Sequence, residues 1–82
     1  MPEAIDVISV FRRGTIKPVK FRYAGRTHKV GKVLYTWVTR DGNFPVYHFS
    51  VTTQDGERFH IQLKTYQMDW LLSAVDEAAA VQ

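Results

Sequence analysis

The chain has 82 residues, of which 45% are hydrophobic, 13% aromatic and 23% charged, and its formal net charge is +3. This composition is typical of one small globular domain spanning residues 1–82, and it argues against disorder, because disordered chains are poor in aromatic and β-branched residues. No apolar run approaches the roughly 20 residues of a membrane-spanning helix, and the first residues lack the pattern of a secretory signal. With no cysteine, disulfides and thiolate metal sites are excluded. We therefore expect a cytoplasmic domain that binds no membrane.

The first predicted strand covers residues 4–11 (AIDVISVF), which are apolar at both parities and therefore indicate a strand covered on both faces. Gly14 predicts a turn after it. The strict alternation of residues 19–23 predicts a half-buried strand. Ala24 and Gly25 are typical of a two-residue hairpin loop that leads into a strand beginning at residue 26 or 27.

This hairpin loop predicts the register of the two strands that it joins. The residues that should face inward are Val19, Phe21, His28 and Val30. On the outer face, Lys20 lies opposite Lys29 and Arg22 opposite Thr27. Like charges directly opposite one another destabilise a hairpin by some tenths of a kcal/mol, and a bound anion would remove that cost.

The third strand continues through residues 33–38, with a β-bulge at Gly31 and Lys32 that changes its inward parity. After the bulge we expect Val33, Tyr35 and Trp37 to face inward, with Trp37 mostly buried. Residues 40–43 form the next turn. A fourth strand then opens at Pro45, and the residues expected to face inward there are Tyr47, Phe49 and Val51.

Residues 54–56 (QDG) predict a three-residue hairpin loop, a type I turn closed by Gly56 at positive φ. This loop pairs Val51 with Phe59, so that each apolar residue of the fifth strand meets an apolar partner. A two-residue loop would set Val51 against His60 instead, and we reject it.

The C-terminal segment, residues 66–82, fits two structures. A helical stripe is formed by Trp70, Leu71, Ala74, Val75 and Ala78, and with Asp69 as N-cap it favours a helix. The alternation of Trp70, Leu72 and Ala74 favours a strand. We predict a mainly β domain (α+β): a small curved antiparallel five-stranded sheet or partly open barrel with a C-terminal helix, or alternatively with a sixth strand at residues 69–75.

No catalytic chemistry is indicated. The serines lack a strained glycine elbow, no carboxylate pair falls in a predicted cleft, and no glycine-rich phosphate loop is present. We therefore expect that the protein is not an enzyme, has no catalytic residue and binds no cofactor.

The histidines do not indicate a metal site. His48 and His60 point outward on adjacent strands, but only as diagonal neighbours, about 7–8 Å apart at Cα. That spacing is wide for two imidazoles that share one zinc ion, and His28 faces the core elsewhere. We therefore expect no bound metal.

The charge is uneven along the chain. Residues 1–40 carry nine basic and two acidic side chains, whereas residues 41–82 carry two basic and six acidic ones. Within residues 12–32 there are eight basic side chains and no acidic one, a pattern that attracts phosphates or an acidic partner, although it also fits a solvated sheet face. The candidate phosphate-binding residues are Arg12, Arg13, Lys20, Arg22, Arg26, Lys29 and Lys32.

Most of the 11 aromatic residues are expected in the core. Tyr23, Phe44 and Tyr66 lie at strand ends or turns, where they can be exposed. Exposed rings beside cations suit single-stranded nucleic acid, because bases stack on the rings while the cations follow the phosphates. Tyr23 is the candidate stacking residue.

The chain also contains the spaced patterns Pro18-x-x-Phe21-x-x-x-Gly25-Arg26-x-x-x-Val30-x-x-Val33-Leu34-x-x-Trp37, Tyr47-x-Phe49-x-Val51, Gly56-x-x-Phe59-x-Ile61 and Trp70-x-Leu72. Together they resemble the core of a small bacterial domain family of uncharacterised function, over about residues 16–76. Domains of that family occur alone or at the C-terminus of polymerase-like proteins of bacterial DNA-damage mutagenesis. The resemblance implies a nucleic-acid or polymerase-complex setting and a last strand around Trp70, and it assigns no catalytic residue.

Two functions follow as hypotheses. The first is a non-catalytic module whose basic hairpin, residues 12–32, contacts nucleic-acid phosphates. The second is a protein-interaction or homodimerisation domain that pairs through an exposed strand edge, with itself or with an acidic protein.

Overall fold

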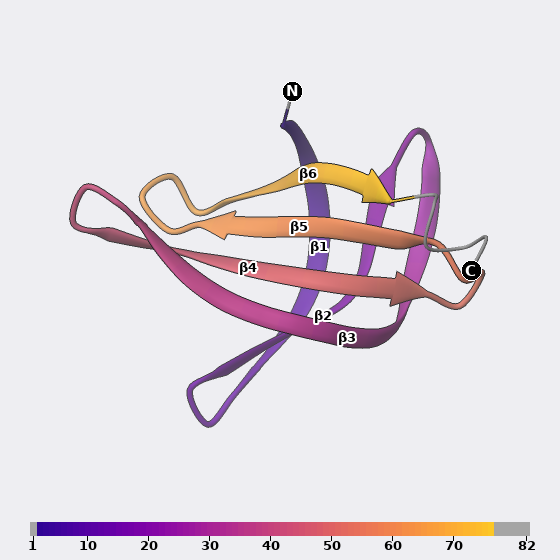
Figure 1. Ribbon diagram of the computed structural model, residues 1–82, viewed down its shortest axis with the longest axis horizontal. Coiled ribbons are helices and arrows are strands. Elements are labelled where there is room, and N and C mark those ends of the chain that lie inside the picture. The colour runs from indigo at the N-terminus through magenta and orange to yellow at the C-terminus, as the bar shows by residue number, and fades with distance from the viewer. Residues whose placement is uncertain (1, 77–82) are drawn as a thin grey trace.

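The structure is a computed structural model that describes residues 2–76 (Figure 1). These residues form strands and turns, without a helix. The strands are β1 (Glu3–Arg12), β2 (Thr15–Tyr23), β3 (Arg26–Asp41), β4 (Phe44–Thr53), β5 (Arg58–Lys64) and β6 (Asp69–Asp76). Each strand pairs antiparallel with the next, and β1 pairs with β6 to close a barrel. The prediction of a mainly β domain is confirmed, whereas the five-stranded sheet and the partly open barrel are wrong.

The predicted C-terminal helix is also wrong, because the segment from Asp69 forms β6, as the alternative prediction had it. Leu72 is buried in the core, and the ring of Trp70 lies 5.6 Å from that of Phe49. β6 supplies partners to the free edges of both β5 and β1, and this pairing outweighs the helix propensity of residues such as Leu71 and Ala74. Ala78, the last residue of the predicted helical stripe, lies outside the described residues.

The predicted hairpin loops are confirmed, and so is the register of the residues next to each loop. Ala24 and Gly25 both have positive φ, as a two-residue type I′ turn requires, and Lys20 pairs with Lys29 across the strands that they join. Gly56 has a φ of 88°, and the amide of Thr53 donates to the carbonyl of Glu57 at 2.8 Å.

β2 and β3 contain three bulges, each marked by one residue without a partner in the register. The bulge at Gly31 was predicted and is confirmed. Leu34 forms a second bulge in β3, and Val19 forms one in β2. Because an extra residue reverses the faces of those that follow it, these two unpredicted bulges decide which side chains reach the surface.

The core is a cluster of apolar side chains inside the barrel. Its buried members are Phe21, Phe49, Val51, Phe59, Ile61 and Leu72. The expectation that β1 is covered on both faces is wrong, because only one of its faces packs on this cluster. On the other face Ile8 is 56% exposed and Val10 is 45% exposed.

Candidate nucleic-acid interface

A groove opens where β2 and β3 separate. The two strands pair from their shared turn only as far as Lys20 and Lys29. Beyond that pair, β2 continues alongside β1 and β3 continues alongside β4, so the gap between them widens. The groove has a volume of about 590 Å³ and is bounded by the β1–β2 hairpin on one side and by residues 30–33 on the other.

Apolar side chains form part of the groove wall. They are Val10, Val19, Val30 and Val33. The expectation that Val19 faces the core is wrong, because its bulge turns it outward, where it is 39% exposed. The wall therefore offers contact surface to the apolar parts of a ligand as well as charge.

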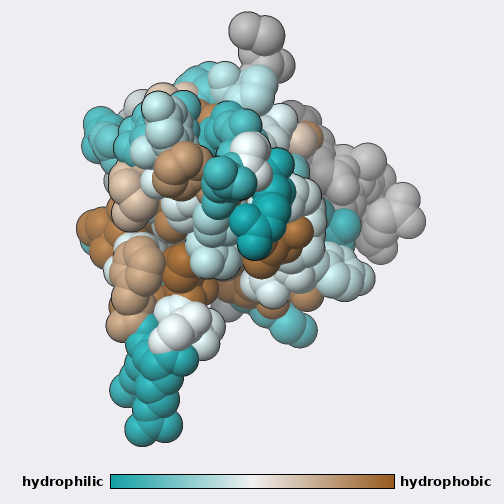
Figure 2. All heavy atoms as spheres, turned by 90° about the vertical axis from the view of Figure 1, so that its left-hand side faces the viewer, coloured by the Kyte–Doolittle hydropathy of each residue, from teal (hydrophilic) through white to brown (hydrophobic). Residues whose placement is uncertain are grey.

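Four cations lie around the groove, and no acidic side chain lines it among the described residues. They are Arg12, Arg13, Lys17 and Lys32. Arg13 and Gly14 form the turn at the end of the hairpin, with φ of 51° and 77°. Figure 2 shows this end as a hydrophilic projection at the bottom of the molecule, with hydrophobic surface above it.

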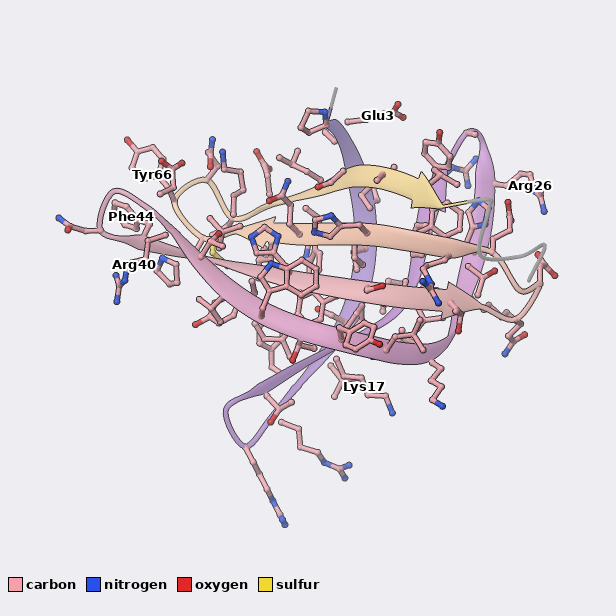
Figure 3. The ribbon with its side chains drawn as sticks, viewed as in Figure 1. Glu3, Lys17, Arg26, Arg40, Phe44 and Tyr66 are labelled. Atoms are coloured by element: carbon pink, nitrogen blue, oxygen red, sulfur yellow. The ribbon has the colours of Figure 1, made fainter. Side chains whose placement is uncertain are left out.

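The other predicted phosphate-binding residues divide between two places. Lys20 and Lys29 form the pair at which the groove begins, and Arg22 lies two residues beyond Lys20. Arg26 is at the turn between β2 and β3, away from Lys17 (Figure 3), and its guanidinium lies 3.8 Å from the carboxylate of Asp55. The groove therefore gathers only part of the predicted basic set.

Two aromatic side chains continue from the groove along the outer face of β3. Lys32, Tyr35 and Trp37 pair with alternate residues of β4, which places the three on one face of the sheet. Tyr35 is 66% exposed and Trp37 is 41% exposed. The prediction that both face the core is wrong, because the bulge at Leu34 reverses the parity of the strand.

His48 and His60 lie beside Trp37 on this face. Their predicted diagonal register is confirmed, but the rings lean toward each other, and Nδ1 of His48 lies 3.0 Å from Nε2 of His60. The indole of Trp37 stacks on the His48 ring, 5.1 Å away and at an angle of 4°. Burial lowers the pKa of both imidazoles, and the proximity of His60 lowers the pKa of His48 further.

The three aromatic residues predicted at strand ends differ in exposure. Tyr23 is half-buried, and its ring makes an edge contact with Phe59 at 5.9 Å. Phe44 and Tyr66 are exposed and lie together beside Arg40 (Figure 3), with their ring centres 4.8 Å apart. Tyr35, which was expected in the core, therefore exposes more of its ring to a ligand than Tyr23 does.

His28 faces inward, as predicted. Its ring stacks on Phe21 at 5.2 Å, and its Nε2 lies 3.3 Å from the carbonyl of Tyr23. In residues 2–76, no group of three or more metal-ligating side chains comes together. The same residues contain no helix of the length and hydrophobicity needed to cross a membrane.

Comparison of the chain with models of known protein families, with curated proteins and with solved structures gave no match.

Proposed function

We propose that this domain is a non-catalytic module that binds single-stranded nucleic acid. The observation that carries the proposal is the groove between β2 and β3, with its four cations and no acidic residue among the described residues of its wall. Such a groove attracts a chain of phosphates, because each cation that neutralises a phosphate releases condensed counterions.

The outer face of β3 supplies the second part of the proposal. Lys32 belongs to the groove, and Tyr35 and Trp37 follow it on the same face. Bases stack on exposed rings with little dependence on sequence, and each stacked base contributes about 1–3 kcal/mol. Since a base inside a duplex is already stacked, these rings favour a single strand over the duplex of the same sequence.

The test is an NMR titration of the isotope-labelled domain with a short mixed-sequence single strand, at low and at physiological salt. We expect shifts in residues 12–20 and 29–37, and weaker binding of the duplex. A spectrum that stays unchanged at low salt would overturn the proposal.

Charge variants make the test specific. Removing Lys32 in K32A should weaken binding and reduce the slope of log affinity against log salt by about 0.7, the value for one single-strand phosphate. The matched control is R26A, which removes a cation that pairs with Asp55 outside the groove. If R26A and K32A reduced the slope equally, binding would follow net charge rather than the groove.

A second candidate function is strand pairing with an acidic protein segment. Within the described residues, β3 pairs from Val30 to Asp41 with β4 alone, which leaves its other edge available. Such an edge can take an extended segment of another chain through main-chain hydrogen bonds. Antiparallel pairing of two copies along residues 31–41 would set Lys32 opposite Arg40, so an acidic segment suits this edge better.

Amide protection distinguishes the two functions. Both partners are anionic, so both should bind less tightly at high salt, but only strand pairing adds main-chain hydrogen bonds along β3. A domain that leaves the single strand unbound but captures an acidic β-strand peptide, with new amide protection along residues 31–41, would establish the second function instead.

A further inference from the structure

The pair of imidazoles on the outer face of the barrel is not explained by nucleic-acid binding. His48 and His60 come from adjacent strands, and the two ring nitrogens that face each other are 3.0 Å apart. At that distance only one of the two nitrogens can carry a proton, so the other presents its lone pair. The pair therefore holds one proton in a position that a small cation can also take.

The separation of the two nitrogens matches that of two ligands on one metal ion. Imidazole nitrogens bind such ions at about 2.0–2.1 Å. An ion at that distance from both nitrogens would subtend an angle of roughly 95° between them, close to the right angle between neighbouring ligands in tetragonal copper(II) and nickel(II) sites.

The surroundings of His48 hold its ring in the orientation that a metal ligand needs. Its Nε2 lies 2.7 Å from the hydroxyl of Thr39. When Nε2–H donates to that hydroxyl, the lone pair is on Nδ1, which faces His60. An outer hydrogen bond that fixes the tautomer is the usual companion of a histidine ligand, and the stacked indole of Trp37 restrains the ring plane.

We propose that His48 Nδ1 and His60 Nε2 form a two-imidazole binding site for a divalent transition-metal ion, with Cu²⁺ bound more tightly than Ni²⁺. Copper is preferred because it stands highest among these ions in affinity for nitrogen ligands. The remaining positions are open to water or to a ligand carried by a partner. The proposal rests on the histidine pair alone and does not depend on nucleic-acid binding.

Trp37 provides the measurement, since Cu²⁺ bound beside a stacked indole quenches its fluorescence. The second tryptophan, Trp70, is replaced in W70F, so that the signal comes from Trp37 alone. This variant, without an affinity tag, is titrated with CuCl₂ and separately with NiCl₂ at neutral pH. We expect saturable one-site quenching by Cu²⁺, confirmed by calorimetry and by nitrogen coupling in the electron paramagnetic resonance spectrum.

Variants of the two ligands test the assignment. H48F and H60F each keep an aromatic ring beside Trp37 but remove one nitrogen ligand, and each should abolish the one-site binding. T39V should weaken it about tenfold, the lower end of the effect of losing an outer hydrogen bond. The matched control is Q62A, because Gln62 pairs opposite His48 in β5 and supplies no imidazole.

Thermal unfolding of each variant shows that its fold is kept. If folded H48F and H60F still bound Cu²⁺ as the parent does, the ion would sit elsewhere and the site would be wrong. If the parent bound no Cu²⁺ in a saturable way, His48 and His60 would be a hydrogen-bonded pair only.

Discussion

Lys20 and Lys29 face each other in the last pair that β2 and β3 share, and the two strands separate directly beyond them. Two ammonium groups at this point repel each other and favour the separation. The same repulsion concentrates positive potential at the start of the groove, where an anion would relieve it.

The first prediction follows from this pair. K20E replaces the repulsion with an attraction to Lys29 and should raise the free energy of unfolding by a few tenths of a kcal/mol. It should also weaken binding of a single strand, because a phosphate would meet a carboxylate. Urea unfolding and fluorescence anisotropy measure the two effects. Unchanged affinity for every polyanion tested would show that these lysines only keep the domain soluble.

The second prediction concerns the turn between β4 and β5. Gly56 has a positive φ, which a β-branched residue adopts only under strain, so G56V should cost more than about 1 kcal/mol of unfolding free energy. A suitable control is G31A. Gly31 does not have a positive φ, and an added Cβ would lie 3.4 Å from the backbone of Thr53. Equal losses in the two variants would contradict the role of the turn.

The third prediction compares two aromatic residues. Phe59 is 1% exposed in the core, and F59A should cost about 3–5 kcal/mol, enough to unfold a domain of this size. W37A removes a surface ring and should leave the protein folded, with a smaller fall in melting temperature. Its main effect should be weaker single-strand binding. Loss of the folded state in W37A would contradict the outward position of the indole.

The fourth prediction concerns pH. The pKa values of His48 and His60 are lowered from 6.5 in the folded protein, so below about pH 6.5 the unfolded chain binds more protons. The free energy of unfolding should therefore fall as the pH falls through and below this value. The double variant H48F/H60F should lose less stability over the same range. Parallel curves for the two proteins would show that other groups cause the change.

The tight turns could be predicted from the sequence. The registers of the strands that they join could be predicted as well, because the length of a hairpin loop sets the register. Gly25 and Gly56 fix the loop lengths, and each loop length allows one pairing of the strands on either side. The bulge at Gly31 could be predicted because a glycine inside a strand pattern is a usual sign of a bulge. These local rules were enough to place Phe21, His28 and Phe59 in the core.

The other two bulges, the structure of the C-terminal segment and the contact between the two histidines could not be predicted, because they depend on contacts that no local sequence pattern indicates. Leu34 and Val19 are ordinary strand residues, and nothing in their chemistry signals a bulge. The C-terminal segment has both periodicities, and the open edges of β1 and β5 decide between them. The contact of His48 with His60 was missed because Cα spacing takes no account of how far two rings can lean.

The extra residue at Leu34 makes the outer face of β3 tolerant of a deletion at that position. Substitution there alters one side chain, and deletion of its codon removes the extra residue while the pairs on either side of the bulge keep their partners in β4. Lys32 and Tyr35 would then be two residues apart in a regular strand, so Tyr35 and Trp37 would stay on the face that they now share with Lys32. A one-residue deletion in a regular stretch of strand instead turns the side chains that follow it to the opposite face. A library of single in-frame deletions should therefore keep the outer face when Leu34 is lost and disturb it when the loss falls in a stretch without an extra residue.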